Sequence, residues 1–358
     1  MIWLLSMILA DKIWSPLKRL LWLFLLISGI TSCTADWKYH FQEGLIYGST
    51  YHVVYEYKER KPLTRDIEQI LTRINNSMSI YDSTSLISRI NRNDPEALLD
   101  EDLKYVLQQG LEISTETGGS FDMTVAPLVN AWGFGFKKRE EVTSELIDSL
   151  LEFTGYQLIR IEGDRLVKVD PRVMIDLNAL VPGYVADLIG AFLESKGVQN
   201  YLVEIGGELR CRGLNPKGTL WRVGVDKPLE GLIDRQIQVV LNLGEISVTT
   251  SGNYRKFYEE GGVKYSHTID PVSGYPARST LLSATVLMRN CIDADAWATA
   301  FMVMGLDRAK EVVNARDDLE VYFIYSDEEG NFQTWESAGM GRYLQESMEE
   351  QQQPDPQP

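Results

Sequence analysis

The sequence is organised around Ser247-Val-Thr-Thr-Ser-Gly-Asn-Tyr-Arg-Lys-Phe-Tyr258 and the following segment Lys264-Tyr-Ser-His-Thr-Ile-Asp-Pro-Val-Ser-Gly-Tyr-Pro276. Two short strand-like runs, 254–258 and 263–269, are separated by Glu-Glu-Gly-Gly, which predicts a β-hairpin. A hydroxyl-rich, glycine-containing loop precedes the hairpin, and His267 lies in its second run. Hydroxyls and backbone N–H groups beside an imidazole can hold a phosphate and move a proton. An ordinary polar hairpin with a solvent-facing histidine would explain the same residues, so the choice depends on the rest of the chain.

The length and composition indicate a folded globular protein. At 358 residues the chain can form one large domain or two moderate ones with a substantial core. Its hydrophobic content of 44% and aromatic content of 10% are those of a globular protein. Lys and Arg number 35 against 51 Asp and Glu, and the resulting net charge of −16 argues against a nucleic-acid partner. A phosphate ligand would therefore be held by local backbone N–H groups or by a metal ion.

The N-terminal segment has the features of a secretory signal. Lys12, Lys18 and Arg19 precede the apolar run 20–30, and small residues follow before Cys33. The run is shorter than the ~20 residues that a membrane-spanning helix needs. Ile30-Thr-Ser-Cys33 is similar to a relaxed bacterial lipobox, in which Cys33 becomes the lipidated N-terminus; an ordinary signal peptide cleaved nearby is the alternative. We expect an exported bacterial lipoprotein, anchored to the membrane by acyl chains at Cys33 and facing the periplasm.

The other cysteines and the histidines restrict the kinds of site. Cys211 and Cys291 do not define a disulfide framework, and two buried thiols are favoured over a bridge. The sequence has three histidines, His40, His52 and His267, which excludes a His-rich metal site. A metal ion, if one binds, is a hard cation with oxygen ligands.

The patterning predicts one continuous α/β domain of mixed α+β type, with two lobes, over 45–340. We expect a signal peptide over 1–32, a lipid-anchored tether over 33–44 and a disordered, Gln- and Pro-rich tail over 341–358. The predicted helices are 63–78, a short one capped by Thr84 or Ser85, 101–116, 143–153, 179–196, 293–305 and 306–314. The predicted strands are 45–57, 157–162, 165–169, 172–177, 201–205, 208–213, 221–226, 236–242, 245–250, 281–288, 319–325 and 331–335. The aromatic- and glycine-rich stretch 120–135 predicts a structured loop.

Two further groupings offer oxygen ligands and N–H donors. Asp295 and Thr299 are four residues apart on a predicted helix, so both side chains project from the same face. Both are hard oxygen donors suited to Mg²⁺, although an aspartate near a helix N-terminus and a core threonine explain the pair more simply. The predicted helix 179–196 follows a tight Asp-Leu-Asn turn, and the N–H groups of its first turn can bind phosphate. The glycine fingerprints of dinucleotide-binding and P-loop folds do not occur where a strand feeds a helix, and Gly-x-Ser-x-Gly does not occur at all, which argues against a Rossmann site and a hydrolase triad.

Seven stretches form a collinear set across 45–335. They are Met78-Ser-Ile-Tyr81 with Ser85 and Ser88-Arg-Ile-Asn91, Gly119-Ser-Phe-Asp-Met-Thr-Val-Ala-Pro-Leu-Val129 with Trp132-Gly-Phe-Gly135, Asp176-Leu-Asn-Ala-Leu-Val-Pro-Gly-Tyr-Val-Ala-Asp187, Glu204-Ile-Gly-Gly-Glu208, Thr250-Ser-Gly-Asn-Tyr254, Tyr265-Ser-His-Thr-Ile-Asp-Pro271 with Gly274-Tyr-Pro276, and Ala294-Asp-Ala-Trp-Ala-Thr299. In this order they resemble the FAD:protein FMN transferase (ApbE) family. Each piece alone is weak evidence, whereas seven in one order are specific.

The resemblance implies an ApbE-like fold, in which helices flank a largely antiparallel mixed sheet and the FAD site lies between two lobes. It implies an enzyme that binds FAD and Mg²⁺, attaches FMN by a phosphoester bond to a Thr of a partner flavoprotein and releases AMP. By position, His267 is the catalytic base, and the metal ligands are the carbonyl of Ala179 and the side chains of Asp295 and Thr299. The positions that contact FAD are Tyr47, Tyr81, Ser120, Phe121, Asp122 and Asp176, with Pro182 near the ligand. The implied acceptors carry a Thr in a small-residue motif, as in subunits of Na⁺-pumping NADH:quinone oxidoreductase or Rnf-type complexes.

The sequence departs from the family pattern at a few positions. Pro182 stands where a Lys is common, and it removes a charge and an N–H group near the ligand. Tyr47 stands where Met is usual, and Asn253 replaces a frequent Asp. Two alternative functions stay open. One is a Mg²⁺-dependent FAD pyrophosphatase, in which water replaces the Thr hydroxyl, and the other is a lipid-anchored protein that binds FAD without catalysis.

Overall fold

The computed structural model describes residues 37–46, 48–59, 61–135, 142–229, 236–253, 257–260 and 263–344, with the backbone alone over 257–260 and 263–266. The predicted signal peptide, Cys33, Tyr47 and the tail from Gln345 onwards lie outside these residues. Tyr39–Tyr57 and Lys61–Pro358 form one unit of the chain, and the architecture below is that of its described part. Within the described ranges, we find no helix with both the length and the apolar character to cross a membrane.

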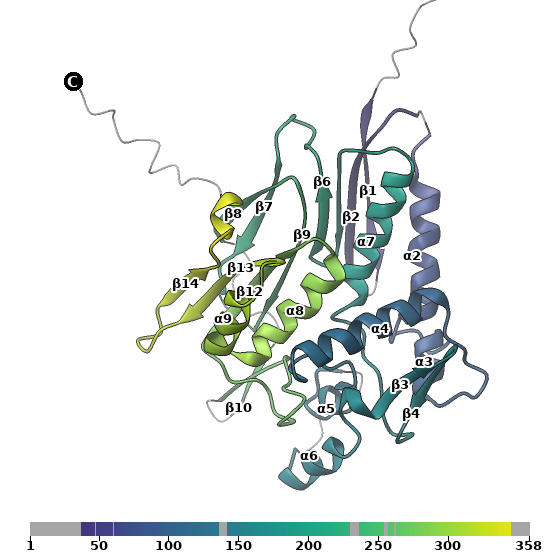
Figure 1. Cartoon of the computed structure of the whole chain (residues 1–358), viewed down its shortest axis with the longest axis vertical. Coiled ribbons are helices and arrows are strands. Elements are labelled where there is room, and N and C mark those ends of the chain that lie inside the picture. The colour runs from purple at the N-terminus through teal and green to yellow at the C-terminus, as the bar shows by residue number, and fades with distance from the viewer. Residues whose placement is uncertain are drawn as a thin grey trace, which may run out of the picture. The chain divides into compact units, whose positions relative to one another are not determined.

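The unit combines strands and helices that are shown in Figure 1. The strands are β1 (Lys38–Ile46), β2 (Ser49–Tyr57), β3 (Ile159–Glu162), β4 (Arg165–Lys168), β5 (Tyr201–Ile205), β6 (Glu208–Arg212), β7 (Trp221–Asp226), β8 (Ile237–Leu243), β9 (Glu245–Gly252), β10 (Phe257–Glu260), β11 (Val263–Ser266), β12 (Leu281–Met288), β13 (Leu319–Ser326) and β14 (Phe332–Glu336). The helices are α2 (Thr64–Met78), α3 (Leu86–Asn91), α4 (Glu101–Glu116), α5 (Ala126–Ala131), α6 (Ser144–Leu151), α7 (Val181–Ser195), α8 (Cys291–Met304) and α9 (Leu306–Asn314), with short 3₁₀ turns η1 (Tyr156–Leu158) and η2 (Met340–Arg342).

A single large sheet organises the unit. Its eight strands follow the order β1-β2-β5-β6-β9-β12-β13-β14. The pairs of β12 with β9 and with β13 are antiparallel, with Thr285 opposite Thr250 and Val286 opposite Val321. Three antiparallel ribbons, β3–β4, β7–β8 and β10–β11, lie outside this sheet. The prediction of a mixed α+β fold with a largely antiparallel sheet is therefore confirmed.

Each face of the sheet carries its own hydrophobic cluster. Side chains alternate along a strand, so Val53 and Tyr55 join the cluster beneath the helices while Val54 packs against the other. Helices α7 and α8 lie on the first face, where α7 contacts β5 and β6, and α8 contacts β9 and β12 (Figure 1). The β7–β8 ribbon covers the second face through residues such as Trp221 and Leu241. The sheet is thus the middle of three layers.

Helix α8 is the most enclosed helix of the first layer. It contacts α4, α7, α9, β9 and β12, and most of its residues are buried. A helix that is surrounded in this way needs apolar residues on all sides, which explains why its sequence shows no apolar stripe. At Gly183 the start of α7 crosses the start of α8 so closely that a Cβ atom would lie 2.5 Å from the Cys291 carbonyl oxygen. The crossing fixes the N-terminal turns of the two helices against each other.

Most predicted elements are present, and several boundaries differ from the prediction. The predicted strand 45–57 is divided between two strands, because Leu45 and Ile46 end β1 and Ser49–Tyr57 form β2. The expected tether extends to residue 44, but Lys38–Ile46 form β1, an edge strand beside β2. The stretch 120–135 contains α5, which the prediction assigned to a loop, with Pro127 in its first turn. At the other end, Leu344 bridges to Leu241, so the ordered structure continues past the predicted boundary at 340.

Two predictions around the site are also corrected. The stretch 172–177 is not a strand, because the backbone of Ile175 bonds to a side chain and Asp176 bonds to Met123, which leaves no ladder with a neighbouring strand. The predicted strand 245–250 is present and continues as β9 to Gly252, with Ser247 and Thr249 buried, so the loop expected before the hairpin is shorter than predicted. The β-hairpin that follows is present as β10–β11, and Cys211 and Cys291 are buried free thiols, as predicted.

Candidate active site

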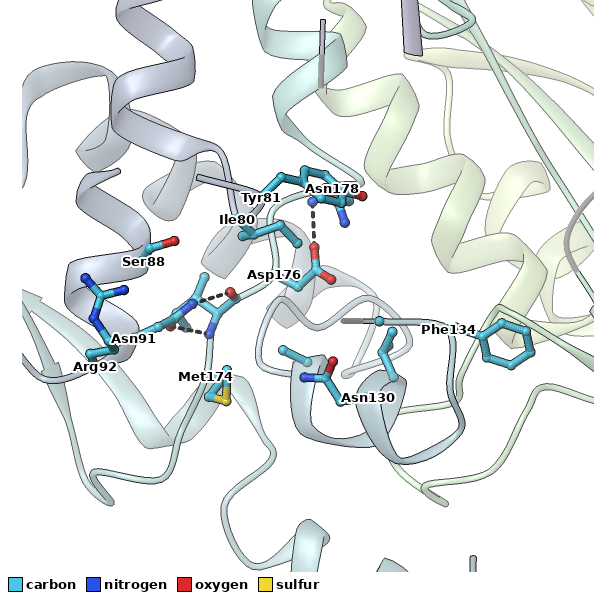
Figure 2. A pocket seen from close by; sticks show the side chains of 14 residues that line it. Ile80, Tyr81, Ser88, Asn91, Arg92, Asn130, Phe134, Met174, Asp176 and Asn178 are labelled. Carbon is cyan, nitrogen blue, oxygen red and sulfur yellow. Dashed lines mark hydrogen bonds between the residues drawn. The ribbon is translucent and has the colours of Figure 1, made fainter. Parts of the chain in front are cut away.

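Two adjoining cavities contain most of the predicted site residues. The first, which we name the Tyr81 cavity, has a volume of about 210 Å³ and is shown in Figure 2. Its lining consists of Ile80, Tyr81, Ser88, Asn91, Arg92, Ala126, Val129, Asn130, Phe134, Gly135, Met174, Ile175, Asp176 and Asn178. The second, the Thr299 cavity, has a volume of about 110 Å³. It is lined by Ser120, Phe121, Asp122, Met123, Val125, Asp176, Asn178, Ala179, Ile269, Pro271, Thr299 and Val303. Asp176 and Asn178 line both, so one short segment forms their common wall.

The common wall is held in place from both sides. The Asn91 side chain donates to the Ile175 carbonyl at 2.9 Å and accepts the Ile175 N–H at 2.8 Å (Figure 2). The Asp176 N–H donates to the Met123 carbonyl at 2.7 Å. The Asn178 N–H then closes a tight turn on Asp176 Oδ1 at 2.8 Å. Asn91 was part of a matching motif, but its role as a clamp could not be predicted because Ile175 is distant in sequence.

The common wall places a carboxyl group and a phenol in a partly desolvated environment. Burial raises the pKa of Asp176, and the hydrogen bond from the Asn178 N–H opposes this shift. Burial also raises the pKa of Tyr81, the negative charge of Asp176 adds to the increase, and a hydrogen bond with the Asn178 side chain opposes it. Tyr81 as a whole residue is nevertheless 58% exposed, so it is accessible to a planar ligand.

The turn 120–124 forms the opposite side of the Thr299 cavity. Asp122 is buried, and its Oδ1 accepts hydrogen bonds from the N–H and hydroxyl of Thr124 at 2.8 and 2.7 Å. Its Oδ2 accepts the Tyr156 N–H at 2.6 Å. Burial raises the pKa of Asp122 despite these bonds. Both oxygens thus serve to hold the turn, and Asp122 shapes the cavity wall that also contains Ser120 and Phe121.

The residues predicted to bind a metal ion meet beside the Thr299 cavity. Thr299 and Ala179 line this cavity, and Asp295 lies one helical turn before Thr299 on α8. Asp295 is 5% exposed, and it accepts a hydrogen bond from the Gly183 N–H at the start of α7. Its Oδ2 is buried and has no hydrogen-bond partner among the described residues. Burial raises the pKa of Asp295 well above its ordinary value, and the negative charge of Glu208 adds to this increase.

A buried carboxylate oxygen without a partner is costly, and a cation beside it would remove that cost. The donor set of a carboxylate, a hydroxyl and a carbonyl is the set that Mg²⁺ prefers, so these residues fit the ion. Among the described residues no group of three or more His, Cys, Asp or Glu could hold a metal. That finding does not conflict with the fit, because only one of the three expected ligands is of those types. The N–H groups at the start of the predicted helix 179–196 were expected to be able to bind phosphate, and in the structure one of them, the Gly183 N–H, is used by Asp295 instead.

His267 lines neither cavity among the described residues, but it lies close to residues that line them. It follows β11 and is half-buried. Its ring meets the Phe134 ring edge-on at a centroid distance of 6.4 Å, and Phe134 lines the Tyr81 cavity. Two residues after it, Ile269 lines the Thr299 cavity. The hydroxyl of Ser251 on β9 lies 3.4 Å from the Thr299 hydroxyl, so the stretch quoted first also reaches the site.

Pro182 lies at the N-terminal end of α7. It occupies the first turn of α7 and belongs to neither cavity lining among the described residues. The first N–H groups of a helix have no intrahelical partner, so a proline there removes no helical hydrogen bond. The departure at Pro182 is therefore compatible with the local fold.

The comparisons with known proteins agree with this geometry. Residues 47–323 match the model of the ApbE family. The chain is 36% identical over 306 residues to the FAD:protein FMN transferase of Vibrio cholerae, covering 83% of this chain and 90% of that protein. It is 35% identical over 297 residues to the protein of the same name from Escherichia coli, covering 80% of this chain and 83% of that protein.

The solved structure named flavin transferase ApbE from Vibrio cholerae superposes with a TM-score of 0.78 and 33% identity, over 86% of this chain and 100% of that one. The family match covers more than half of the sequence, and both the sequence relatives and the solved structure extend over most of it. The chain belongs to the ApbE family.

Proposed function

We propose that this chain is an FAD:protein FMN transferase that attaches FMN by a phosphoester bond to a Thr of a partner flavoprotein and releases AMP. The observation that carries the proposal is the wall shared by the Tyr81 and Thr299 cavities. FAD is a dinucleotide with two halves joined by a pyrophosphate, and two adjoining cavities offer one place for each half. Asp176 and Asn178 separate two cavities of suitable kind, and the pair Asp295 and Thr299 lies beside one of them. The names of the relatives support the same activity.

The residues of the two cavities would bind and orient FAD. Tyr81 offers an exposed ring face to a planar ring system, and Ser120 and Phe121 form the wall of the second cavity. Asp176 presents its carboxyl group to both cavities and is held rigidly by Asn91 and Met123. Rigid placement matters here because phosphoryl transfer depends mainly on orientation and charge stabilisation.

His267 would accept the proton of the acceptor Thr. The Thr oxygen attacks the phosphorus of the FMN half, a new O–P bond forms, and the bond from phosphorus to the AMP oxygen breaks. The Thr proton passes to an imidazole nitrogen of His267, because histidine is a side chain that can act as a general base near neutral pH. The Ala179 carbonyl, Asp295 and Thr299 would hold Mg²⁺, which when bound neutralises charge on the pyrophosphate.

The proposed activity is tested with the full chain in detergent, FAD, Mg²⁺ and an acceptor domain from the flavin-carrying subunit of a Na⁺-pumping NADH:quinone oxidoreductase. Mass spectrometry follows the acceptor while chromatography follows AMP and FMN. We expect a covalent FMN adduct with one AMP released per adduct, and a loss of at least ~100-fold in His267→Ala. Free FMN and AMP without an adduct would identify a pyrophosphatase instead, and bound but intact FAD would identify a storage protein.

We further propose that the protein is exported and anchored at Cys33, with the catalytic unit facing the periplasm. The support is the basic and apolar pattern of the N-terminal segment and the lipobox-like Ile30-Thr-Ser-Cys33. Two or more acyl chains at this residue would give stable attachment. Metabolic labelling with a palmitate analogue tests the proposal, since Cys33→Ala should abolish labelling and release the protein from the membrane fraction. Labelling that survives the substitution would refute it.

A further inference from the structure

The loop that follows His267 is unusually well fixed for a segment with exposed apolar side chains. The Asp270 N–H donates to the Tyr275 carbonyl at 2.9 Å, and the Gly274 N–H donates to the Asp270 carbonyl at 2.9 Å. The Asp270 carboxylate accepts the Val272 N–H at 3.0 Å and the Ser273 hydroxyl at 2.7 Å. The Asp270 carboxylate thus makes its hydrogen bonds within the loop.

The loop is also attached to the body of the protein. The indole N–H of Trp132 donates to the Gly274 carbonyl at 2.9 Å, and the Trp132 and Tyr275 rings lie 5.8 Å apart. Gly274 has a φ of 77°, and a Cβ atom there would lie 2.5 Å from Ile147, so the backbone is packed tightly against the helical side. The loop therefore holds one shape, which reduces the entropy lost when a partner binds it.

Two large side chains of this fixed loop are nevertheless partly exposed. Val272 is 68% exposed and Tyr275 is 42% exposed. Isolated exposed apolar residues are common, but these two share one rigid loop that also contributes Pro271 to the lining of the Thr299 cavity. Val272 lies beside Gly119, and the next residue, Ser120, lines the same cavity. Val272 is therefore close to two segments that line the Thr299 cavity.

We propose that Val272 and Tyr275 form the docking surface for the Thr-bearing segment of the acceptor protein. The inference rests on the proposed function, in which a protein hydroxyl must enter beside His267. An extended segment with small apolar residues around its Thr fits this surface, because the loop offers apolar contact and its carboxylate is satisfied internally. Tyr275 is of a residue type that is enriched among the energetically dominant contacts of protein interfaces.

The test compares Val272→Asp and Tyr275→Ser with a matched control, Val169→Asp. Val169 is 64% exposed, follows β4 and lies in neither cavity lining among the described residues. The assay uses the full chain in detergent and the same acceptor domain. We expect both loop variants to raise the KM for the acceptor about tenfold or more, which corresponds to a loss of ~1.4 kcal/mol or more of binding free energy. The affinity for FAD should stay at the wild-type value in these variants, and Val169→Asp should behave as wild type in both measurements.

Three outcomes would overturn the assignment. An unchanged acceptor KM in both loop variants would show that the acceptor docks elsewhere. An equal increase in Val169→Asp would show a general effect of added charge. Weaker FAD binding in the loop variants would place the loop in the FAD site. Release of AMP and FMN without an adduct by the wild-type protein would instead refute the proposed function, and the docking surface with it.

Discussion

At the scale of single residues, Asp295 is the most informative side chain of the site. Its Oδ2 is buried without a hydrogen-bond partner in the described part of the chain, and Glu208 adds further negative charge. We expect Mg²⁺ to raise the melting temperature of the wild-type protein by roughly 5 °C at a hundredfold excess over its Kd. Asp295→Asn should abolish this increase, because the neutral amide gives up the charge that attracts the cation.

Differential scanning fluorimetry with and without Mg²⁺ measures this effect without any turnover. Asp293→Asn is the matched control on the same helix, since the Asp293 carboxylate accepts a hydrogen bond from the Asn290 side chain at 2.9 Å. It should retain the Mg²⁺-dependent increase. An equal increase in Asp295→Asn and wild type would remove Asp295 from the metal site.

Lys168 gives a pH-dependent prediction at the same scale. Its ammonium group donates to the Ile90 carbonyl at 2.8 Å, next to the clamp residue Asn91, and burial lowers the pKa of Lys168 to about 8. The unfolded chain, with an ordinary lysine pKa, binds more protons than the folded one between about pH 8 and 10.4, so stability rises with pH in this window.

The free energy of unfolding of wild type minus that of Lys168→Met should therefore increase from pH 8 to 10. We expect a change on the order of 1 kcal/mol, smaller than the full shift would give because the side chain is partly exposed to water. Urea denaturation at both pH values measures it. A difference that stays constant or falls with pH would contradict the assigned pKa.

At the scale of elements, α8 shows where prediction from sequence succeeded and where it failed. The spacing of Asp295 and Thr299 predicted one helical face, and the turn residues placed most strands and helices correctly. What fixes the start of α8 is distant in sequence: its own cap residue Asn290 makes no side-chain cap bond, and Asp187 of α7 accepts the Ile292 N–H at 3.0 Å. The stretch 172–177 failed for the same reason, since its apolar alternation suggested a strand and only the fold reveals the clamp by Asn91.

This arrangement makes Asp187 a positioning residue for the metal site. It also pairs with Arg210 on β6 at 2.9 Å, and burial raises the pKa of Asp187. Asp187→Asn should lower stability by about 3 kcal/mol and weaken Mg²⁺ binding, because the first turn of α8 loses its charged cap. Glu194→Gln is the control, since Glu194 pairs with the same Arg210 at 3.1 Å and makes no contact with α8 among those found.

Isothermal titration with Mg²⁺ and urea denaturation separate the two effects. The control should lose stability and keep its affinity for Mg²⁺, whereas Asp187→Asn should lose both. If the two variants bind Mg²⁺ equally well, Asp187 contributes only to stability.

At the scale of the whole unit, the sheet separates a core that supports the site from one that does not. Phe301 is fully buried on α8 and meets Phe323 edge-on at 5.5 Å, in the same cluster as the helices that carry the metal residues. Trp221 is buried in the cluster on the opposite face, under the β7–β8 ribbon. Truncation of either residue to alanine should cost about 3–5 kcal/mol of stability.

The two variants should nevertheless differ in catalysis. Trp221→Ala should keep the kcat/KM of the wild type at temperatures where it stays folded, because no residue of its cluster lines either cavity. Phe301→Ala, or the milder Phe301→Leu if the first unfolds, should lower kcat/KM as well, because a shift of α8 moves Asp295 and Thr299 together. Urea denaturation paired with FMN-transfer kinetics at 25 °C distinguishes these cases. Equal losses of kcat/KM in the two variants would mean that the sheet transmits strain between its faces, and the site would then depend on the whole unit and not on one layer.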